Sequence, residues 1–142
     1  MAHVKDEFLR KLISHVNKKD WWHVPPLDPL AYSKRGKFLS SSFRDAEFWG
    51  RPLDIPEHVS ISNPLIGDEP TIEMVLFGKP VKHPEPGASG SMEFQFKLDA
   101  RMKRAALSKG YDSIVLMTSK AFSVYKGQGK MPRSVELNIL KP

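Results

Sequence analysis

The 142-residue sequence contains no cysteine, which excludes disulfides, thiolate nucleophiles and zinc sites that use cysteine. It also has no apolar run that approaches the roughly 18 residues of a membrane-spanning helix. Its five histidines, His3, His15, His23, His58 and His83, form no helical i, i+4 pair and show no carboxylate at ligand spacing. We therefore predict no metal site, and expect any chemistry to use oxygen and nitrogen groups.

The residues that are present describe a small globular protein. Hydrophobic residues make up 40%, with three Trp, three Tyr and eight Phe, and the length fits a single domain over residues 1–142. Residues 1–7 lack the features of a secretory signal, so a soluble, cytoplasmic protein is expected. The net charge of +6 favours acidic partners such as nucleic acid, nucleotide phosphates or acidic proteins, although a soluble basic protein needs none.

Apolar spacing predicts both helices and strands. Helices are expected over residues 4–16, 29–32, 44–49, 71–77 and 94–109, the last of them basic and followed by Gly110 as its C-cap. Ser42 is expected to cap the helix over 44–49. Strands are expected over residues 21–24, 38–40, 59–62, 113–117, 122–125 and 134–140. The irregular alternation and the consecutive closing strands indicate an α+β fold.

One long segment has no periodic apolar pattern. Residues 78–91 are rich in proline, glycine and serine, so we predict a mobile loop there. Such a loop is either a lid or a simple insertion.

Several short motifs follow one another in a recognisable order: Trp22-His23, Gly36-Lys37-Phe38, Ala46-Glu47-Phe48, Lys109-Gly110-Tyr111-Asp112-Ser113-Ile114-Val115 and Val135-Glu136-Leu137-Asn138. In this order they resemble the ADP-ribosyltransferase superfamily, as a small, divergent member of its His-Tyr-Glu type. The resemblance spans roughly residues 20 to 140. It implies a mixed or antiparallel split sheet, with an N-terminal helix and a basic helix before the last strands.

The resemblance also implies a chemistry and the residues that perform it. The expected activity is NAD-dependent ADP-ribosyl transfer, with NAD as substrate and a protein or nucleic-acid acceptor. Glu136 corresponds to the catalytic carboxylate that stabilises the positively charged sugar as the nicotinamide–ribose bond breaks. His23 would bind the adenosine-side ribose, Phe38 and Phe48 would flank the nicotinamide ring, and Ser40 would bind the carboxamide or brace its strand.

Each of these residues also has a purely structural interpretation. His23 fits a partly buried strand histidine that the backbone satisfies, and Phe38 and Phe48 fit core aromatics. Trp49 is assigned to the core. The serines at 40–42 fit a turn and a helix cap, and Glu136 fits a solvent-facing strand residue.

The sequence departs from the family pattern at two places. Val24 replaces the glycine that usually follows the histidine, and Pro25-Pro26 follows it. Ser134 stands where arginine-modifying members carry Glu or Gln, so an arginine acceptor is not implied. Two other functions stay open: nucleic-acid binding through the basic helix, and a non-catalytic relative that binds or inhibits a partner.

Overall fold

The computed structural model describes residues 4–142. Its elements are α1 (Asp6–Lys18), β1 (Trp22–His23), α2 (Ala31–Arg35), β2 (Lys37–Ser40), α3 (Phe43–Glu47), β3 (Pro64–Gly67), α4 (Glu69–Phe77), α5 (Ser91–Ser108), β4 (Ser113–Leu116), α6 (Ser119–Gln128) and β5 (Glu136–Ile139). This mixture confirms the predicted α+β class. None of these helices is long and apolar enough to cross a membrane.

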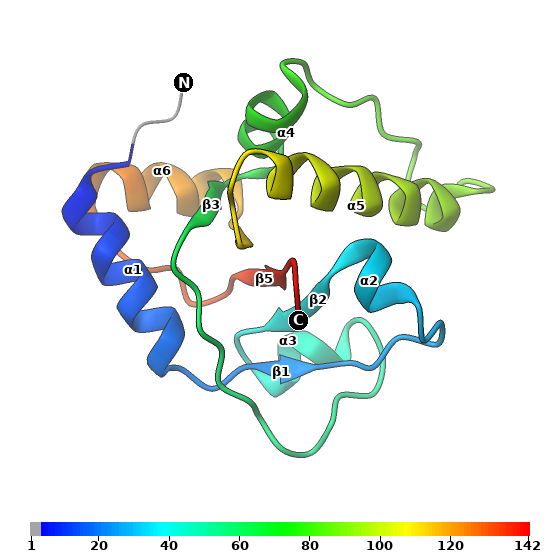
Figure 1. Ribbon diagram of the computed structural model, residues 1–142, viewed down its shortest axis with the longest axis horizontal. Helices are drawn as coiled ribbons and strands as arrows, with labels where there is room; N and C mark the ends of the chain where they lie inside the picture. The colour runs from blue at the N-terminus through cyan, green and yellow to red at the C-terminus, as the bar shows by residue number, and fades with distance from the viewer. Residues whose placement is uncertain (1–3) are drawn as a thin grey trace.

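The five strands form one mixed sheet in the order β1-β2-β5-β4-β3. Strands β1, β2, β5 and β4 pair antiparallel, whereas β3 runs parallel to β4. The last strand of the chain, β5, therefore lies at the centre of the sheet, between β2 and β4 (Figure 1). This topology brings residues from both ends of the sequence together.

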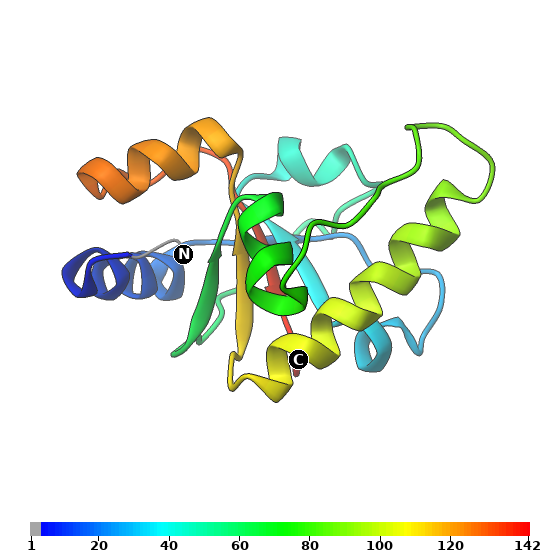
Figure 2. The same ribbon diagram turned by 90° about the horizontal axis from the view of Figure 1, so that it is seen from above.

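Helices cover both faces of the sheet. Figure 2 shows α1 and α6 on one side of the strands and α4 and α5 on the other. The first core joins α1 and α6 to the sheet through Leu12, Val16, Phe122, Tyr125, Leu39, Val115 and Leu137. The second joins α4 and α5 to it through Ile72, Leu76, Ala106, Leu65 and Ile114. Because side chains alternate along a strand, neighbouring residues such as Ile114 and Val115 belong to different cores.

At one end of the sheet, side-chain caps fix the first turns of two helices that follow strands, α3 after β2 and α4 after β3. Ser42 caps α3 as predicted, because its hydroxyl accepts a hydrogen bond from the Asp45 amide at 3.0 Å. Asp68 caps α4 in the same way through the Thr71 amide, also at 3.0 Å. At Gly67 a Cβ would lie 3.2 Å from the Thr71 side chain, so glycine lets the first turn of α4 approach the strand end closely.

Two predicted strands are wrong. Residues 122–125 belong to helix α6, which Thr118 caps and Gly129 ends at a φ of 72°. Phe122 and Tyr125 are both buried and three residues apart, which is helical spacing. Residues 59–62 form no strand, and the strand lies at Pro64–Gly67 instead. All four of its residues are buried, so β3 has no alternating pattern for the sequence to show.

Residues 78–90 join α4 to α5 without forming a helix or strand. This segment matches the predicted loop in position, and its mobility stays a prediction. It contacts α4 through the Val81 amide, which donates a hydrogen bond to Glu73 Oε1 at 2.9 Å.

Candidate functional site

An open cleft of about 620 Å³ lies at one end of the sheet. Its lining comes from the ends of β2 and β4, the start of β5, the first turn of α4, the start of α6, and α3 with the residues that follow it. Ser40 pairs with Glu136, and Glu136 pairs with Leu116 on its other side. Paired residues share a face of the sheet, so Glu136 lies in a row between a hydroxyl and an apolar side chain.

The three consecutive serines have different roles. Ser40 lines the cleft and is buried. The Ser41 hydroxyl accepts a hydrogen bond from the Val135 amide at 3.1 Å, which joins the end of β2 to the residue before Glu136. Ser42 caps α3. The turn and cap interpretation is therefore right for Ser41 and Ser42, while Ser40 stays available to a ligand.

Glu136 is partly buried, and its surroundings favour the protonated form. Burial raises the pKa of Glu136 to about 7, and the negative charges of Asp99 and Glu69 add to the rise. Burial likewise raises the pKa of Asp99 to about 6. A carboxyl group with a pKa near neutrality in a cleft is a candidate for chemistry, and a solvated strand residue would not show this shift.

Two large aromatic side chains are exposed in the same cleft as Glu136. Phe48 is 83% exposed and Trp49 65% exposed, both line the cleft, and their rings meet edge to face at 5.1 Å between centroids. The assignment of Trp49 to the core is therefore wrong. Both residues follow the short helix α3, which ends before it can bury them. Exposed aromatic faces at a cleft are suited to a flat ring.

His23 lies outside the cleft lining. It pairs with Leu39, a residue of the first core, and so falls by register on the face opposite to Ser40 and Glu136. Its Nδ1 donates to the Phe38 carbonyl at 2.7 Å, and its Nε2 lies 2.8 Å from the Tyr32 hydroxyl. Burial lowers the pKa of His23, which favours the neutral ring, with Nε2 accepting from Tyr32.

Phe38 is also absent from the cleft lining. It lies two residues before Ser40 on the same strand and pairs with Asn138 of β5. The structure therefore gathers Ser40, Phe48 and Glu136 into one cleft, while His23 lies on the opposite face of the sheet and Phe38 lies further along β2.

The cleft is acidic although the protein is basic. Asp45, Asp68, Glu69 and Glu136 line it, with Arg44 as the basic side chain among its lining residues. Asp45 also accepts a hydrogen bond from the Ser134 hydroxyl at 2.8 Å. This charge favours a ligand that presents a positive group to the sheet end.

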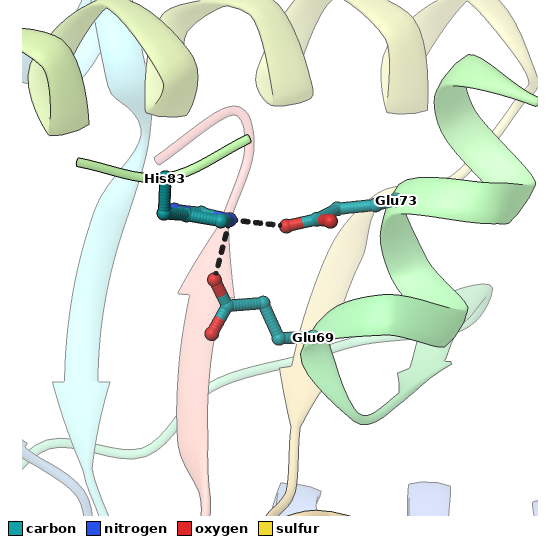
Figure 3. Close-up of side chains that lie close together, drawn as sticks. All are labelled: Glu69, Glu73 and His83. Atoms are coloured by element: carbon teal, nitrogen blue, oxygen red, sulfur yellow. Dashed lines mark hydrogen bonds and ion pairs between the residues drawn. The ribbon is translucent and has the colours of Figure 1, made fainter. Parts of the chain in front are cut away.

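A second cluster of ionisable side chains adjoins the cleft. Glu69 and Glu73 of α4 both point to His83 of the 78–90 segment (Figure 3). His83 Nε2 lies 2.6 Å from Glu73 Oε2 and 2.8 Å from Glu69 Oε1. The sequence predicted this helix only from residue 71. The cap at Asp68 and Pro70 in the first turn would have extended it to include Glu69 and revealed an i, i+4 pair of glutamates.

A third feature is a basic groove of about 660 Å³ between α2 and α5. Its basic side chains are Lys34, Arg35, Lys97, Lys103, Arg104 and Lys141, and Asp28 and Glu93 also line it. Lys103 joins the two helices by donating to the Ser33 carbonyl at 2.6 Å.

Comparison with models of known protein families, with curated proteins and with solved structures finds no match to the chain.

Proposed function

We propose that the protein is an NAD-dependent ADP-ribosyltransferase that cleaves the nicotinamide–ribose bond and transfers ADP-ribose to a protein or nucleic-acid acceptor. One observation carries the proposal. Ser40, Phe48 and Glu136, to each of which the resemblance gives a role at the NAD site, line the same open cleft. An ADP-ribosyltransferase-like fold is part of the proposal, with the serine strand β2 beside the glutamate strand β5.

The cleft contains groups suited to each part of this reaction. Breaking the bond leaves positive charge on the ribose, and a fixed carboxylate such as Glu136 stabilises charge that develops in the transition state. The nicotinamide ring of NAD is itself cationic, which fits the acidic lining. Phe48 and Trp49 offer faces on which this ring stacks, at about 0.5–1.5 kcal/mol for a well-oriented pair.

His23 and Phe38 support this site indirectly. The hydrogen bond from His23 to the Phe38 carbonyl ties β1 to the strand that carries Ser40. We assign both residues to positioning β2, and NAD contacts to Ser40, Phe48 and Trp49.

The test is to incubate the protein with NAD labelled in its ADP-ribose part and to measure nicotinamide release and label transfer. Glu136→Gln is expected to reduce release at least about 100-fold, as loss of a transition-state electrostatic group does. Glu47→Gln, an exposed change on α3 outside the cleft, is the matched control and should leave release unchanged. Equal release by wild type and Glu136→Gln, or none by either, contradicts the proposal.

The basic groove favours a second candidate function, the binding of nucleic acid as partner or acceptor. Phosphate contacts make affinity fall steeply with salt concentration. The double change Lys97→Gln, Arg104→Gln should weaken binding to a single-stranded oligonucleotide and flatten this salt dependence. Lys11→Gln, an exposed change on α1 beyond the opposite face of the sheet (Figure 2), is the control. If the affinity for the oligonucleotide did not change with salt concentration, the groove would be excluded as a nucleic-acid binding site.

A further inference from the structure

Three ligand-forming atoms converge on one point between α4 and the 78–90 segment (Figure 3). They belong to Glu69, Glu73 and His83, and all lie within 4.8 Å of one another. Helical geometry places the two glutamates on one face of α4, because they are four residues apart. His83 reaches them from a separate segment and packs edge to face on Phe94 of α5, with 5.9 Å between the ring centroids.

An ion pair between His83 and one glutamate would leave the other glutamate without a partner of opposite charge. An imidazole nitrogen carries one hydrogen, yet carboxylate oxygens of both Glu69 and Glu73 lie within 2.8 Å of His83 Nε2. A histidine side chain carries at most one positive charge, so His83 can balance at most one of the two carboxylate charges. Within residues 4–142, no lysine or arginine forms an ion pair with either glutamate.

The uncompensated negative charge of the cluster is costly because Glu73 is buried. Its side chain is 4% exposed, and a buried carboxylate is costly unless it is paired with a cation. Its Oε1 is already held by the Val81 amide, which fixes the side chain and directs Oε2 toward His83 and Glu69. Glu69 and His83 are more exposed, at 55% and 32% of their side chains, so the cluster opens to solvent on their side.

We propose that Glu69, Glu73 and His83 form a binding site for a divalent transition-metal ion of the Zn²⁺ class. Two carboxylate oxygens and one imidazole nitrogen are a donor set that zinc accepts with water in the remaining position. An imidazole ligand favours zinc and its neighbours over Mg²⁺ and Ca²⁺, which prefer oxygen. The sequence prediction of no metal site missed this cluster, because His83 is ten residues from Glu73 and only the fold brings it back.

The location suggests what the ion does. Glu69 is a ligand and also lines the cleft, so the ion would lie at the cleft rim and tie the 78–90 segment to α4. The metal site does not depend on the proposed transferase activity, because its three ligands include neither Glu136 nor any group of NAD.

The test is calorimetric titration of the full chain with Zn²⁺, in parallel with Mg²⁺. Wild type should bind one Zn²⁺ through this cluster and prefer it to Mg²⁺. Glu69→Gln and His83→Gln should each weaken Zn²⁺ binding at least about tenfold, since even outer-shell changes at metal sites have effects of this size. Glu69 is exposed, and within residues 4–142 its carboxylate bonds only His83, so the Gln variant should keep the fold, which circular dichroism checks.

The matched control is His58→Gln. His58 pairs with Asp20 at 2.8 Å in an exposed histidine–carboxylate contact that is not part of any three-residue cluster in the described chain. This variant should bind Zn²⁺ as wild type does. If Zn²⁺ does not bind, or binds wild type and both cluster variants with equal affinity, the three residues are an ion-pair cluster and the metal site is wrong.

Discussion

Glu136 combines a central position in the sheet with a carboxyl group that holds its proton near neutral pH. The pKa of about 7 has two consequences, one for activity and one for stability. In the proposed reaction the ionised form of Glu136 is the active one, because only the carboxylate stabilises a positively charged sugar.

The rate of nicotinamide release should therefore depend on pH. As pH rises, kcat/KM should increase about tenfold per unit below pH 7 and level off above it, with a midpoint near the pKa of Glu136 in the free protein. Measuring initial rates from pH 5 to pH 9 checks this. A profile that is flat between pH 6 and pH 8 would show that Glu136 does not set the rate.

The same shift predicts a gain in stability when the charge is removed. The folded-state pKa of Glu136 lies above its ordinary value of 4.5, so the folded state holds its proton more tightly and loses stability as pH rises from about 4.5 through 7. Glu136→Gln should raise the free energy of unfolding at pH 8 by about 1–3 kcal/mol, since one pKa unit corresponds to about 1.4 kcal/mol.

Urea denaturation at two pH values measures this difference. At pH 4.5 the wild type and Glu136→Gln should unfold at nearly the same urea concentration, because Glu136 is then protonated in the folded state. Equal stabilities at pH 8 as well would mean that burial of Glu136 carries no penalty. A variant that is more stable yet inactive would identify Glu136 as a residue kept for function at the expense of stability.

At the scale of the elements, the turn from α2 into β2 depends on one glycine. Gly36 has a φ of 90°, and a Cβ there would approach the Ile139 carbonyl oxygen at 2.8 Å and also meet the Asn138 side chain. Both are residues of β5, so any displacement would disturb the pairing that places Ser40 beside Glu136.

Gly36→Ala should lower the free energy of unfolding by about 2–4 kcal/mol, from backbone strain together with the clash. Gly110 is the matched control, because it has the same φ of 90° but nothing within 4 Å of its Cβ position. Gly110→Ala should lower it by only about 1–2 kcal/mol. Thermal and urea unfolding of both variants measure the difference. An equal loss in the free energy of unfolding for the two variants would show that the clash at Gly36 costs nothing.

The sequence predicted the elements whose signals are local. Ser42 as a cap and Gly110 after the basic helix follow from side-chain and backbone geometry within a few residues, and the structure has both. The strand at 64–67 was missed because burial on both faces removes alternation. Phe122 to Tyr125 was misread because four apolar-rich residues are too few to separate a strand from a helix.

The candidate site likewise contains residues that short sequence motifs indicate and residues whose position only the fold determines. Glu136, Ser40 and Phe48 were predicted from the resemblance, and the structure places all three at one cleft. The exposure of Trp49 depends on where α3 ends, and no local pattern gives that. His83 comes close to Glu69 only through the path of the whole 78–90 segment. The register of β1 against β2 places His23 on the face of the sheet opposite to the cleft, and the sequence does not show this register.

At the scale of the whole molecule, charge is separated between two depressions. Four carboxylates line the cleft at the sheet end, whereas six basic side chains line the groove between α2 and α5. The net charge of +6 therefore does not show that one depression is acidic and the other is basic. A cationic ring in the cleft and a polyanionic acceptor in the groove would each meet complementary charge.

The central position of β5 makes the sheet dependent on the C-terminal residues. A chain ending at residue 133 would leave β2 and β4 without their shared partner, and the two halves of the sheet would lose all direct pairing. We expect this truncated chain to lack the near-ultraviolet circular dichroism of the native protein. Removing only Lys141 and Pro142, which are exposed, is the control and should preserve the spectrum.

The same feature sets an order of events during synthesis. Strand β5 follows every other strand in the chain, and Ser40 meets Glu136 only after nearly a hundred intervening residues have been made. A nascent chain on the ribosome therefore holds β2 and β4 as exposed, unpaired edges that can aggregate or recruit a chaperone. A chain that terminates before residue 136 therefore lacks the proposed catalytic carboxylate and the strand that joins β2 to β4.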